Sequence, residues 1–393
     1  MIQLDNAKEL QLERYNAFRG AIRDDAPKTR VPLYNMDMTW KVFDQGYSLK
    51  DAIYDWDLML KIYCEFQMRY NYDLYFSIGN RNPLQVTDVI GYDGYKIENE
   101  QIVFPDSEVK MREDEYPVLI EKGMIKFYFE NIIPRIGKFK DQQDAIEKLA
   151  RMAEEEQKEL NYVSNWTKQF TEGFGCVMSN PVGSLCSGTI MLFNYLRGMK
   201  GFATDMRRRP ALVKEASQVI FNVCGGFRAF DKYKGEQTDW AFPVSFSCLE
   251  HTVMNPKQFG EFIWPYMEVF IKKVTDMDIT GYFFCEGGVS NMLDYLKEAP
   301  SGHFMLWQEM DDIRMLKKEL PQLAHAGGMP VDILGSATPE KCVDYAKGLI
   351  DDIGFDGKYI FCTNKFPTYK NDCNRENLTA VLDFIRDYGV YNK

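Results

Sequence analysis

The sequence has few histidines, no paired-cysteine motif and no long apolar run. Its nine cysteines are odd in number and scattered without a CxxC spacing, which argues against a disulfide scaffold and for a reducing compartment. No apolar run approaches the ~18 residues of a membrane-spanning helix. Residues 1–14 are polar and lack the apolar segment of a signal peptide. We therefore expect a cytoplasmic protein that does not enter a membrane.

Basic residues are fewer than acidic residues. The 47 Lys and Arg residues are outnumbered by 58 Asp and Glu residues, which gives a net charge of −11. Nucleic acids and anionic membranes select basic surfaces, so neither is an expected partner. Aromatic residues, by contrast, make up 14% of the chain, and there are 20 methionines. This composition suits a pocket for an apolar ligand, although an ordinary core uses the same residues.

No repeat, low-complexity stretch or linker divides the chain, so we expect a single domain over residues 1–393. Residues 1–30 predict a leading amphipathic helix, and residues 90–104 predict a β-hairpin that turns at Asp93-Gly94. Short apolar strands alternate with helices through the rest. The expected strands are 31–37, 73–79, 241–249, 279–285, 303–307, 322–326 and 358–362, and the expected helices are 49–70, a helical region from 115 to 160, 256–277, 291–298, 311–320, 339–352 and 377–388.

This alternation predicts an α/β fold with parallel strands and right-handed crossovers. A doubly wound sheet would show the same alternation. A barrel is favoured because no glycine-rich phosphate loop follows a strand, and because reactive side chains follow several strands. The predicted architecture is a (β/α)8 TIM barrel with an N-terminal helical extension and an inserted hairpin.

Reactive side chains follow the last strands of this predicted barrel, at the end where barrel active sites lie. Glu286 comes directly after an apolar strand and before two glycines. Glu309 and Asp311 follow the next strand, while His325 and Cys362 lie at the ends of the last two. A thiol, carboxylates and an imidazole at one level are the donors that a catalytic zinc ion uses. The remaining cysteines are expected to be small buried hydrophobes.

Several segments of the chain form a pattern whose order and spacing are more specific than any one of them. The sequence resembles the uroporphyrinogen decarboxylase-like superfamily, and within it the corrinoid-dependent methyltransferases, over roughly residues 30 to 390. The segments that carry the resemblance are 194–199, 205–206, 209–210, 259–265, 285–287, 327–330, 335–340 and 376–391. The resemblance implies a (β/α)8 barrel, in agreement with the alternation of strands and helices.

The resemblance also bears on the reaction. Members that decarboxylate uroporphyrinogen grip its carboxylates with an arginine-containing N-terminal motif, whereas the stretch 35–40 here offers an acid and apolar groups. Members that methylate a thiol carry His-x-Cys at a strand end. In this chain Phe283 or Phe284 replaces the histidine, and either Cys285 or Glu286 replaces the cysteine. Both departures disfavour those reactions and favour removal of a methyl group from an ether, such as a methoxylated phenol.

The resulting hypothesis is an O-demethylating, zinc-dependent methyltransferase of anaerobic metabolism that passes the methyl group to a corrinoid on a separate partner protein. The resemblance implies that zinc would polarise the ether oxygen and that Glu309 or Asp311 would donate a proton. Asp37, Trp40 and His251 would line the pocket. The predicted zinc ligands are Glu286, His325 and Cys362, with Cys285 as the substitute for Glu286.

Two alternatives remain open on the sequence. One is a metal-free decarboxylase of the same fold that acts on another small acid, with Asp37 and His325 as acid and base. The other is a non-catalytic barrel, which the reactive strand ends disfavour. The sequence is compatible with a homo-oligomer and does not identify the methyl donor.

Overall fold

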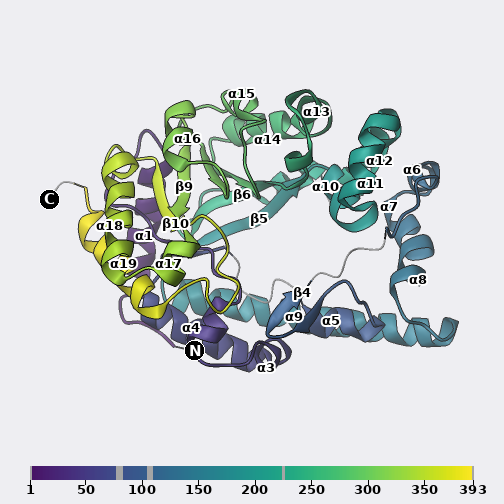
Figure 1. The fold of residues 1–393 in the computed structure, drawn as a ribbon, viewed down its shortest axis with the longest axis horizontal. Coiled ribbons are helices and arrows are strands. Elements are labelled where there is room, and N and C mark those ends of the chain that lie inside the picture. The colour runs from purple at the N-terminus through teal and green to yellow at the C-terminus, as the bar shows by residue number, and fades with distance from the viewer. Residues whose placement is uncertain (1, 77–82, 104–108, 224–225, 392–393) are drawn as a thin grey trace.

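The centre of the protein is a six-stranded parallel sheet with the order β10-β9-β8-β7-β6-β5 (Figure 1). It is seen in a computed structural model that describes residues 2–76, 83–103, 109–223 and 226–391. The strands are β5 (Met178–Cys186), β6 (Trp240–Cys248), β7 (Gly281–Cys285), β8 (Phe304–Gln308), β9 (Ala324–Met329) and β10 (Tyr359–Thr363). The predicted α/β class and parallel pairing are confirmed.

Helices connect these strands and cover the outer face of the sheet. Between β6 and β10 they are α13 (Pro256–Phe262), α14 (Trp264–Asp276), α15 (Leu293–Leu296), α16 (Ile313–Glu319), α17 (Val331–Ser336) and α18 (Pro339–Leu349), and α19 (Arg375–Tyr388) follows β10. The predicted start of α18 is confirmed, because the Thr338 side chain caps the helix by accepting the N–H of Lys341 and Pro339 stands in its first turn.

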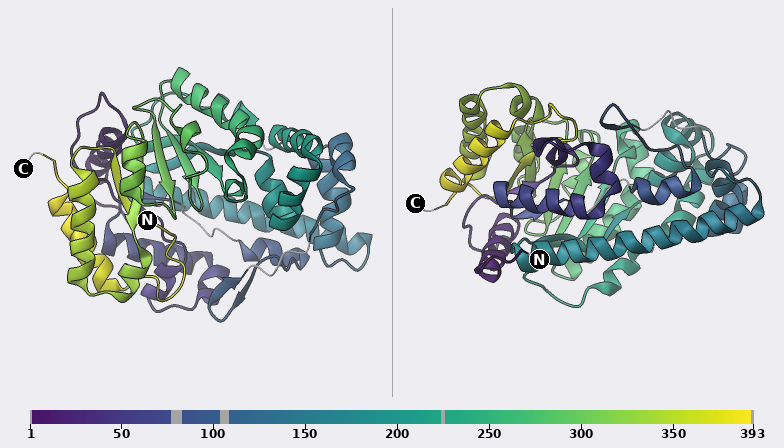
Figure 2. Two further views of the ribbon diagram at one scale, coloured as in Figure 1. Left: turned by 45° about the horizontal axis from the view of Figure 1, so that its top comes forward. Right: turned by 90° about the horizontal axis from the view of Figure 1, so that it is seen from below.

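The first half of the chain is mainly helical, and much of it beyond α1 extends away from the sheet. Its helices are α1 (Ala7–Ile22), α2 (Trp40–Asp44), α3 (Leu49–Tyr54), α4 (Trp56–Tyr70), α5 (Leu84–Thr87), α6 (Tyr116–Lys122), α7 (Met124–Phe127), α8 (Ile133–Ile136), α9 (Gln142–Lys168), α10 (Thr189–Met191), α11 (Gly198–Arg208) and α12 (Pro210–Val223). Figure 2 shows α9 running along much of the molecule. None of the described helices is long and apolar enough to cross a membrane.

In this half one predicted turn is wrong and one strand was not predicted. The antiparallel pair β3 (Lys96–Glu98) and β4 (Gln101–Val103) turns at Asn99 and Glu100, which have φ values of 50° and 58°, and the predicted turn at Asp93-Gly94 is wrong. Strand β5 was not predicted, because its register shifts between Ser179 and Gly183 break the alternation of apolar residues. The predicted strand 73–79 continues past Phe76 into residues 77–79, which lie outside the described residues.

Side-chain alternation divides the sheet into an outer and an inner face. Outward residues such as Phe246, Phe283 and Leu306 belong to the large core under the helices. Inward residues form a separate core, to which α1 contributes Phe18 and Ile22. The inner core also contains Tyr34, Leu74, Phe242, Tyr282, Met305, Ala324 and Ile360. Because successive side chains of a strand point to opposite faces, this division decides which strand-end residues can meet.

A short parallel pair, β1 (Tyr34–Asn35) and β2 (Leu74–Tyr75), lies between the two edges of the six-stranded sheet. One parallel bridge joins Leu33 to Phe361 at the β10 edge, and another joins Leu74 to Val177 beside β5. The N–H of Val177 donates to the carbonyl of Asp73 at 3.0 Å, a normal distance for a hydrogen bond between strands. The pair is therefore tied to both edges of the sheet.

The Asp73 carboxylate anchors this strand pair. It lies 3.2 Å from Nε of Arg14 on α1 and 2.6 Å from Nη1 of Arg30, and it accepts the N–H of Leu33 at 2.8 Å. Burial by itself would raise the pKa of Asp73, but the two guanidinium groups and the Leu33 N–H lower it below its usual value. The buried carboxylate therefore stays ionised and ties α1, β1 and β2 together.

Replacing Asp73 with Asn should lower the free energy of unfolding by about 3 kcal/mol, because the buried Arg14 guanidinium loses its anionic partner and Arg30 is left with Glu13. Urea denaturation at pH 7 measures this loss. Since the pKa of Asp73 is depressed in the folded protein, its contribution is present above its unfolded pKa of about 4 and is lost as the pH falls through the folded pKa. The stabilities of wild type and variant should therefore converge in acid.

The control is Asp25→Asn, which removes a carboxylate that meets Arg23 on the surface. An exposed ion pair contributes little, so this change should cost far less than the loss of Asp73. Equal losses in the two variants would show that Asp73 is not the anchor of the strand pair.

Candidate active site at the carboxyl ends of the strands

Four aromatic side chains meet on the inner face near the carboxyl ends of the strands. Phe284 stacks on Trp307 with ring centroids 4.9 Å apart and an interplanar angle of 4°. Phe76 lies 4.9 Å from Phe284, and Phe366, in the loop after β10, lies 5.1 Å from Trp307. We call Phe76, Phe284, Trp307 and Phe366 the aromatic wall. Phe284 and Trp307 are buried, whereas Phe76 and Phe366 are partly exposed, so the aromatic wall can offer apolar contact to a ligand ring through these two members.

A group of serines faces the same side from β5 and β6. Ser245 donates a hydrogen bond to Ser184 at 2.9 Å, and the Ser184 and Ser247 hydroxyls are also 2.9 Å apart. The register pairs Ser245 with Tyr282 and Ser247 with Phe284, both of which point inward. These serines are not among the predicted site residues. Two serines with a period of two in an otherwise apolar strand were the signal that could have revealed them.

Carboxylates follow β7 and β8, and two of them hold the turn after β7. Glu309 accepts the N–H of Gly287 at 2.8 Å, and Asp311 accepts the N–H of Val289 at 2.5 Å and the Ser290 hydroxyl at 2.7 Å. Gly287 has a φ of 83°, which favours glycine in this turn. The two predicted proton donors therefore position the turn. Alternation from Phe284 places Glu286 on the inner side.

Glu250, just after β6, is a buried carboxylate that is not among the predicted site residues. It accepts hydrogen bonds from the hydroxyls of Ser187 at 2.6 Å and Thr189 at 2.8 Å, and from the N–H of Leu249 at 3.0 Å. Burial raises the pKa of Glu250, and these hydrogen bonds oppose the shift in part. Glu250 is therefore a group that can hold a proton near the strand ends.

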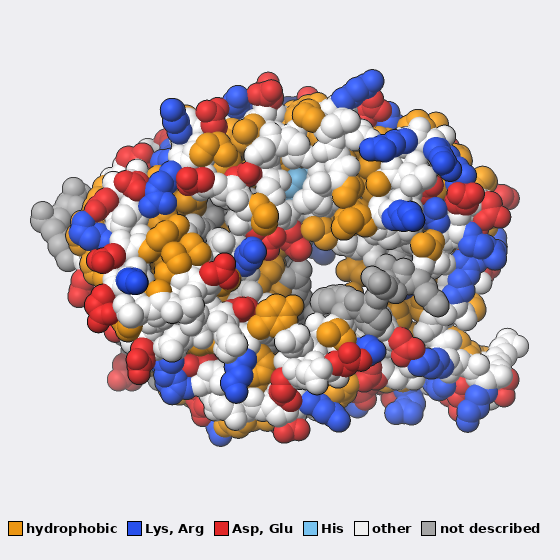
Figure 3. All heavy atoms as spheres, viewed as in Figure 1, with side chains coloured by type: hydrophobic (Ala, Val, Ile, Leu, Met, Phe, Trp, Pro, Cys, Tyr) orange, Lys and Arg blue, Asp and Glu red, His pale blue; other side chains and the backbone are white. Residues whose placement is uncertain are grey.

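The face of the molecule seen in Figure 1 is hollowed. Figure 3 shows this hollow between the sheet on one side and the β3–β4 hairpin and α9 on the other, with acidic side chains gathered on the sheet side. Some of the Asp and Glu residues that make the net charge negative therefore lie beside the hollow, and others lie on the helices. An anionic ligand would be repelled at this edge.

Comparison with known proteins places the chain in a family. The family model described as uroporphyrinogen decarboxylase (URO-D) matches residues 122–388. The chain belongs to the uroporphyrinogen decarboxylase family. A search of curated proteins found no match. The matched region contains all of β5 to β10, and hence most of the inner face described above. The resemblance seen in the sequence is confirmed at the level of this family, whose members are enzymes, while the methyltransferase branch stays a prediction.

Within this family fold, the predicted zinc ligands do not gather. Cys285 points outward into the core under the helices, and His325 also lies outward, with Nε2 2.9 Å from the carbonyl of Leu320. Cys362 points inward and is buried. Among the residues that the structure describes, no three His, Cys, Asp or Glu side chains are arranged to hold a metal ion. The predicted ligand set therefore does not fit a zinc ion.

The residues predicted to line the pocket have other partners. Asp37 forms a buried ion pair with Lys41, with Oδ1 and Nζ 2.8 Å apart. The Trp40 indole donates to the carbonyl of Cys373 at 2.9 Å and is buried. His251 is buried as well, with Nε2 3.0 Å from the carbonyl of Gly288. Asp37 and Trp40 thus anchor α2, and His251 joins the end of β6 to the turn after β7.

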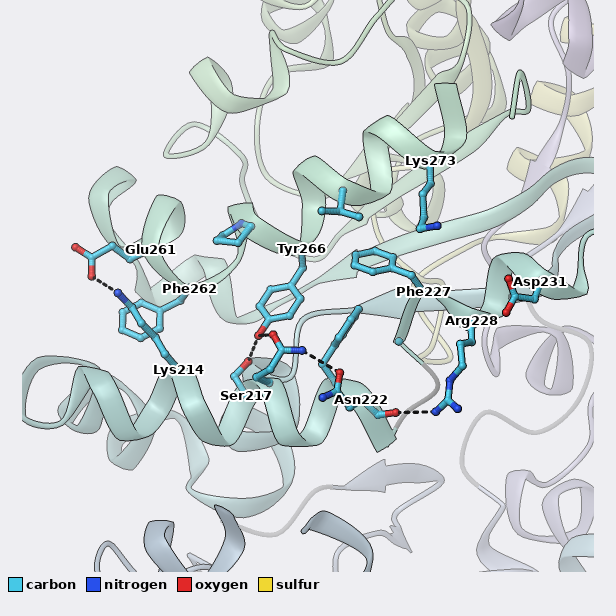
Figure 4. Close-up of a pocket in the computed structure, with 15 residues that line it drawn as sticks. Lys214, Ser217, Asn222, Phe227, Arg228, Asp231, Glu261, Phe262, Tyr266 and Lys273 are labelled. Atoms are coloured by element: carbon cyan, nitrogen blue, oxygen red, sulfur yellow. Dashed lines mark hydrogen bonds and ion pairs between the residues drawn. The ribbon is translucent and has the colours of Figure 1, made fainter. Parts of the chain in front are cut away.

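A cavity of about 780 Å³ lies elsewhere, on the flank between α12 and α14 (Figure 4). Its polar side chains are largely engaged with one another. Lys214 pairs with Glu261 at 3.1 Å, and the Ser217 hydroxyl lies 3.3 Å from that of Tyr266. The Tyr266 hydroxyl also donates to Gln218, whose amide donates to Asn222. The cavity lies on the outer, helix-covered side of the sheet, so its volume does not make it the active site of a barrel-type enzyme.

The two buried histidines should make the protein less stable in mild acid. Burial lowers the pKa of both His251 and His325 to about 4. Since these folded pKa values lie below the unfolded value of about 6.5, stability is full above that pH and falls towards pH 4, by at most about 1.4 kcal/mol per pH unit for each histidine. Urea denaturation across this range, with and without His325→Gln, measures the effect. The variant should show a shallower decline, and an unchanged slope would mean that His325 is not enclosed.

Proposed function

We propose that this member of the uroporphyrinogen decarboxylase family is a methyltransferase that removes the methyl group of a small aromatic methyl ether. The observation that carries the proposal is the aromatic wall near the carboxyl ends of the strands, in which the buried, stacked pair of Phe284 and Trp307 supports the partly exposed Phe76 and Phe366. A flat apolar substrate gains contact there without having to approach the acidic edge with a charge of its own. The methyl acceptor in this proposal is a corrinoid carried by a partner protein. This partner would dock over the carboxyl ends of the strands, which we call the mouth of the barrel.

The proposal includes a closed (β/α)8 barrel. In that reading β1 and β2 complete the ring, through the bridge from Leu33 to Phe361 on one side and the bridge from Leu74 to Val177 on the other. A barrel places the ends of all eight strands around one mouth, where the serines of β5 and β6 lie beside the aromatic residues of β7 and β8. The inner core and α1 fill the opposite end.

In the reaction, a bound corrinoid would supply the cobalt nucleophile that accepts the methyl group. The chain's own residues would hold the substrate ring against the partly exposed Phe76 and Phe366 and keep water from the reacting bond. The departing oxygen needs a hydrogen-bond donor or a proton. Glu286 lies on the inner side two residues after Phe284 and is our candidate for that group, in place of the predicted Glu309 and Asp311. No step is assigned to zinc, because Cys285 and His325 point away from the inner face.

A decarboxylase is the second candidate, because the matching family model carries that description. The acid–base pair that the sequence suggested for it does not assemble. Asp37 is paired with Lys41, and the His325 side chain lies on the outer face of β9. The acidic strand ends also oppose a substrate with several carboxylates. These observations favour methyl transfer over decarboxylation.

The test is methyl transfer from 2-methoxyphenol to reduced cobalamin, followed by the change in cobalamin absorbance and by the catechol formed. Wild type should transfer the methyl group, and Glu286→Gln should lower kcat by about 100-fold or more, because the departing oxygen loses its acid. Glu298→Gln, on the exposed surface, is the matched control and should keep full activity. Carbon dioxide release from a porphyrinogen, without any methyl transfer from ethers, would instead establish the decarboxylase.

A further inference from the structure

The hydroxyl groups of Ser184, Ser245 and Ser247, which we call the serine cluster, face the inner side at the carboxyl half of β5 and β6. Ser245 is buried, Ser247 is half-buried and Ser184 is exposed. An inward side chain that is solvent-exposed marks open space inside the sheet. Nearer the amino ends, inward residues such as Phe242 and Tyr282 are fully buried. The serine cluster therefore stands where the filled inner core gives way to an open mouth.

The strand register sets the serine cluster beside the aromatic wall. Ser247 is paired with Phe284 in the neighbouring strand, and Phe284 is paired with Trp307 in the next. Residues in register on parallel strands point to the same face, so the three side chains form one row. Phe76 is partly exposed and lies 4.9 Å from Phe284, so a ring that contacts Phe76 approaches the row that carries the Ser247 hydroxyl. The mouth therefore carries hydroxyl groups at β5 and β6 and aromatic rings at β7 and β8.

The serine cluster has three hydroxyl protons and uses two of them in hydrogen bonds within the cluster, so one proton is left to donate. Each hydroxyl has one proton to donate and can accept two hydrogen bonds. The bond from Ser245 to Ser184 uses one proton, and the bond between Ser184 and Ser247 uses a second. Whichever of these two donates to the other, one of them retains its proton. Since Ser184 is exposed and Ser247 is half-buried, either hydroxyl can donate the remaining proton to a ligand in the mouth.

We infer that the serine cluster is an oxygen-binding site, which donates a hydrogen bond to the ring-bound oxygen of an aromatic substrate held by the aromatic wall. This inference rests on the proposed function and names its substrate class as aryl ethers and phenols rather than aromatic hydrocarbons. When the bond between the methyl carbon and the oxygen breaks, its electron pair stays on the oxygen. The hydroxyl donor then stabilises the phenolate that develops, as donors do in an oxyanion hole.

The experiment compares two ligands of the same shape, methoxybenzene and ethylbenzene, by isothermal titration calorimetry without any corrinoid. Wild type should bind methoxybenzene about tenfold more tightly, since only its oxygen accepts a hydrogen bond. The double variant Ser184→Ala/Ser247→Ala should lose this preference and keep its affinity for ethylbenzene. Thermal unfolding of each variant verifies that it is folded.

Ser245→Ala is the matched control within the serine cluster. Removing Ser245 leaves two hydroxyls and one hydrogen bond between them, so one proton is still available and the preference for methoxybenzene should persist. Equal affinity of wild type for the two ligands, a preference that survives in the double variant, or no saturable binding of methoxybenzene would each overturn the inference. A preference that depends on Ser184 and Ser247, together with no methyl transfer to cobalamin, would leave the oxygen site standing and remove only the proposed reaction.

Discussion

The ion cluster around Asp73 holds the first two strands in place, and the geometry of the inner face depends on it. Arg14 comes from the leading helix and Arg30 from the segment before β1, and both meet the same buried carboxylate at the start of β2. Strands β1 and β2 are too short to be fixed by their own ladder, which has only the pairs Tyr34–Leu74 and Asn35–Tyr75. The ion pairs of Asp73 with Arg14 and Arg30 hold the two strands in place where the short ladder does not. Without this tie, Phe76 would not be held against Phe284, and the aromatic wall would lose one member.

The inner face that results has an apolar side and a polar side. Phe284 and Trp307 stack on β7 and β8, while Ser184 and Ser247 stand on β5 and β6. Acidic groups follow the strands at the rim, where Glu309 and Asp311 hold the turn after β7 in place. A site of this kind binds a flat molecule by its ring and orients it by an oxygen at the edge. This combination is what connects the family fold to an aryl ether as substrate.

The sequence by itself determined the fold class, the family, and the positions of most strands and helices of the second half. These features rest on local signals that survive in any context: apolar runs of strand length, helix caps such as Thr338, and the order of the segments that resemble the family. The sequence also indicated that reactive side chains cluster at strand ends, as seen for Glu286 and Glu309. It did not reveal β5, because the bulge there hides the period of two.

Only the tertiary structure decided which strand-end residues share a face. Cys285 and Glu286 are neighbours in the chain, yet Cys285 points to the helices and Glu286 follows the inward row of Tyr282 and Phe284. His325 has a donor-type side chain but lies outward, next to the inward Ala324 and Ala326. A shift of one residue reverses the face, and strand boundaries read from sequence are uncertain by more than that. The sequence therefore determined the level at which the site lies, and the register of the strands determined its members.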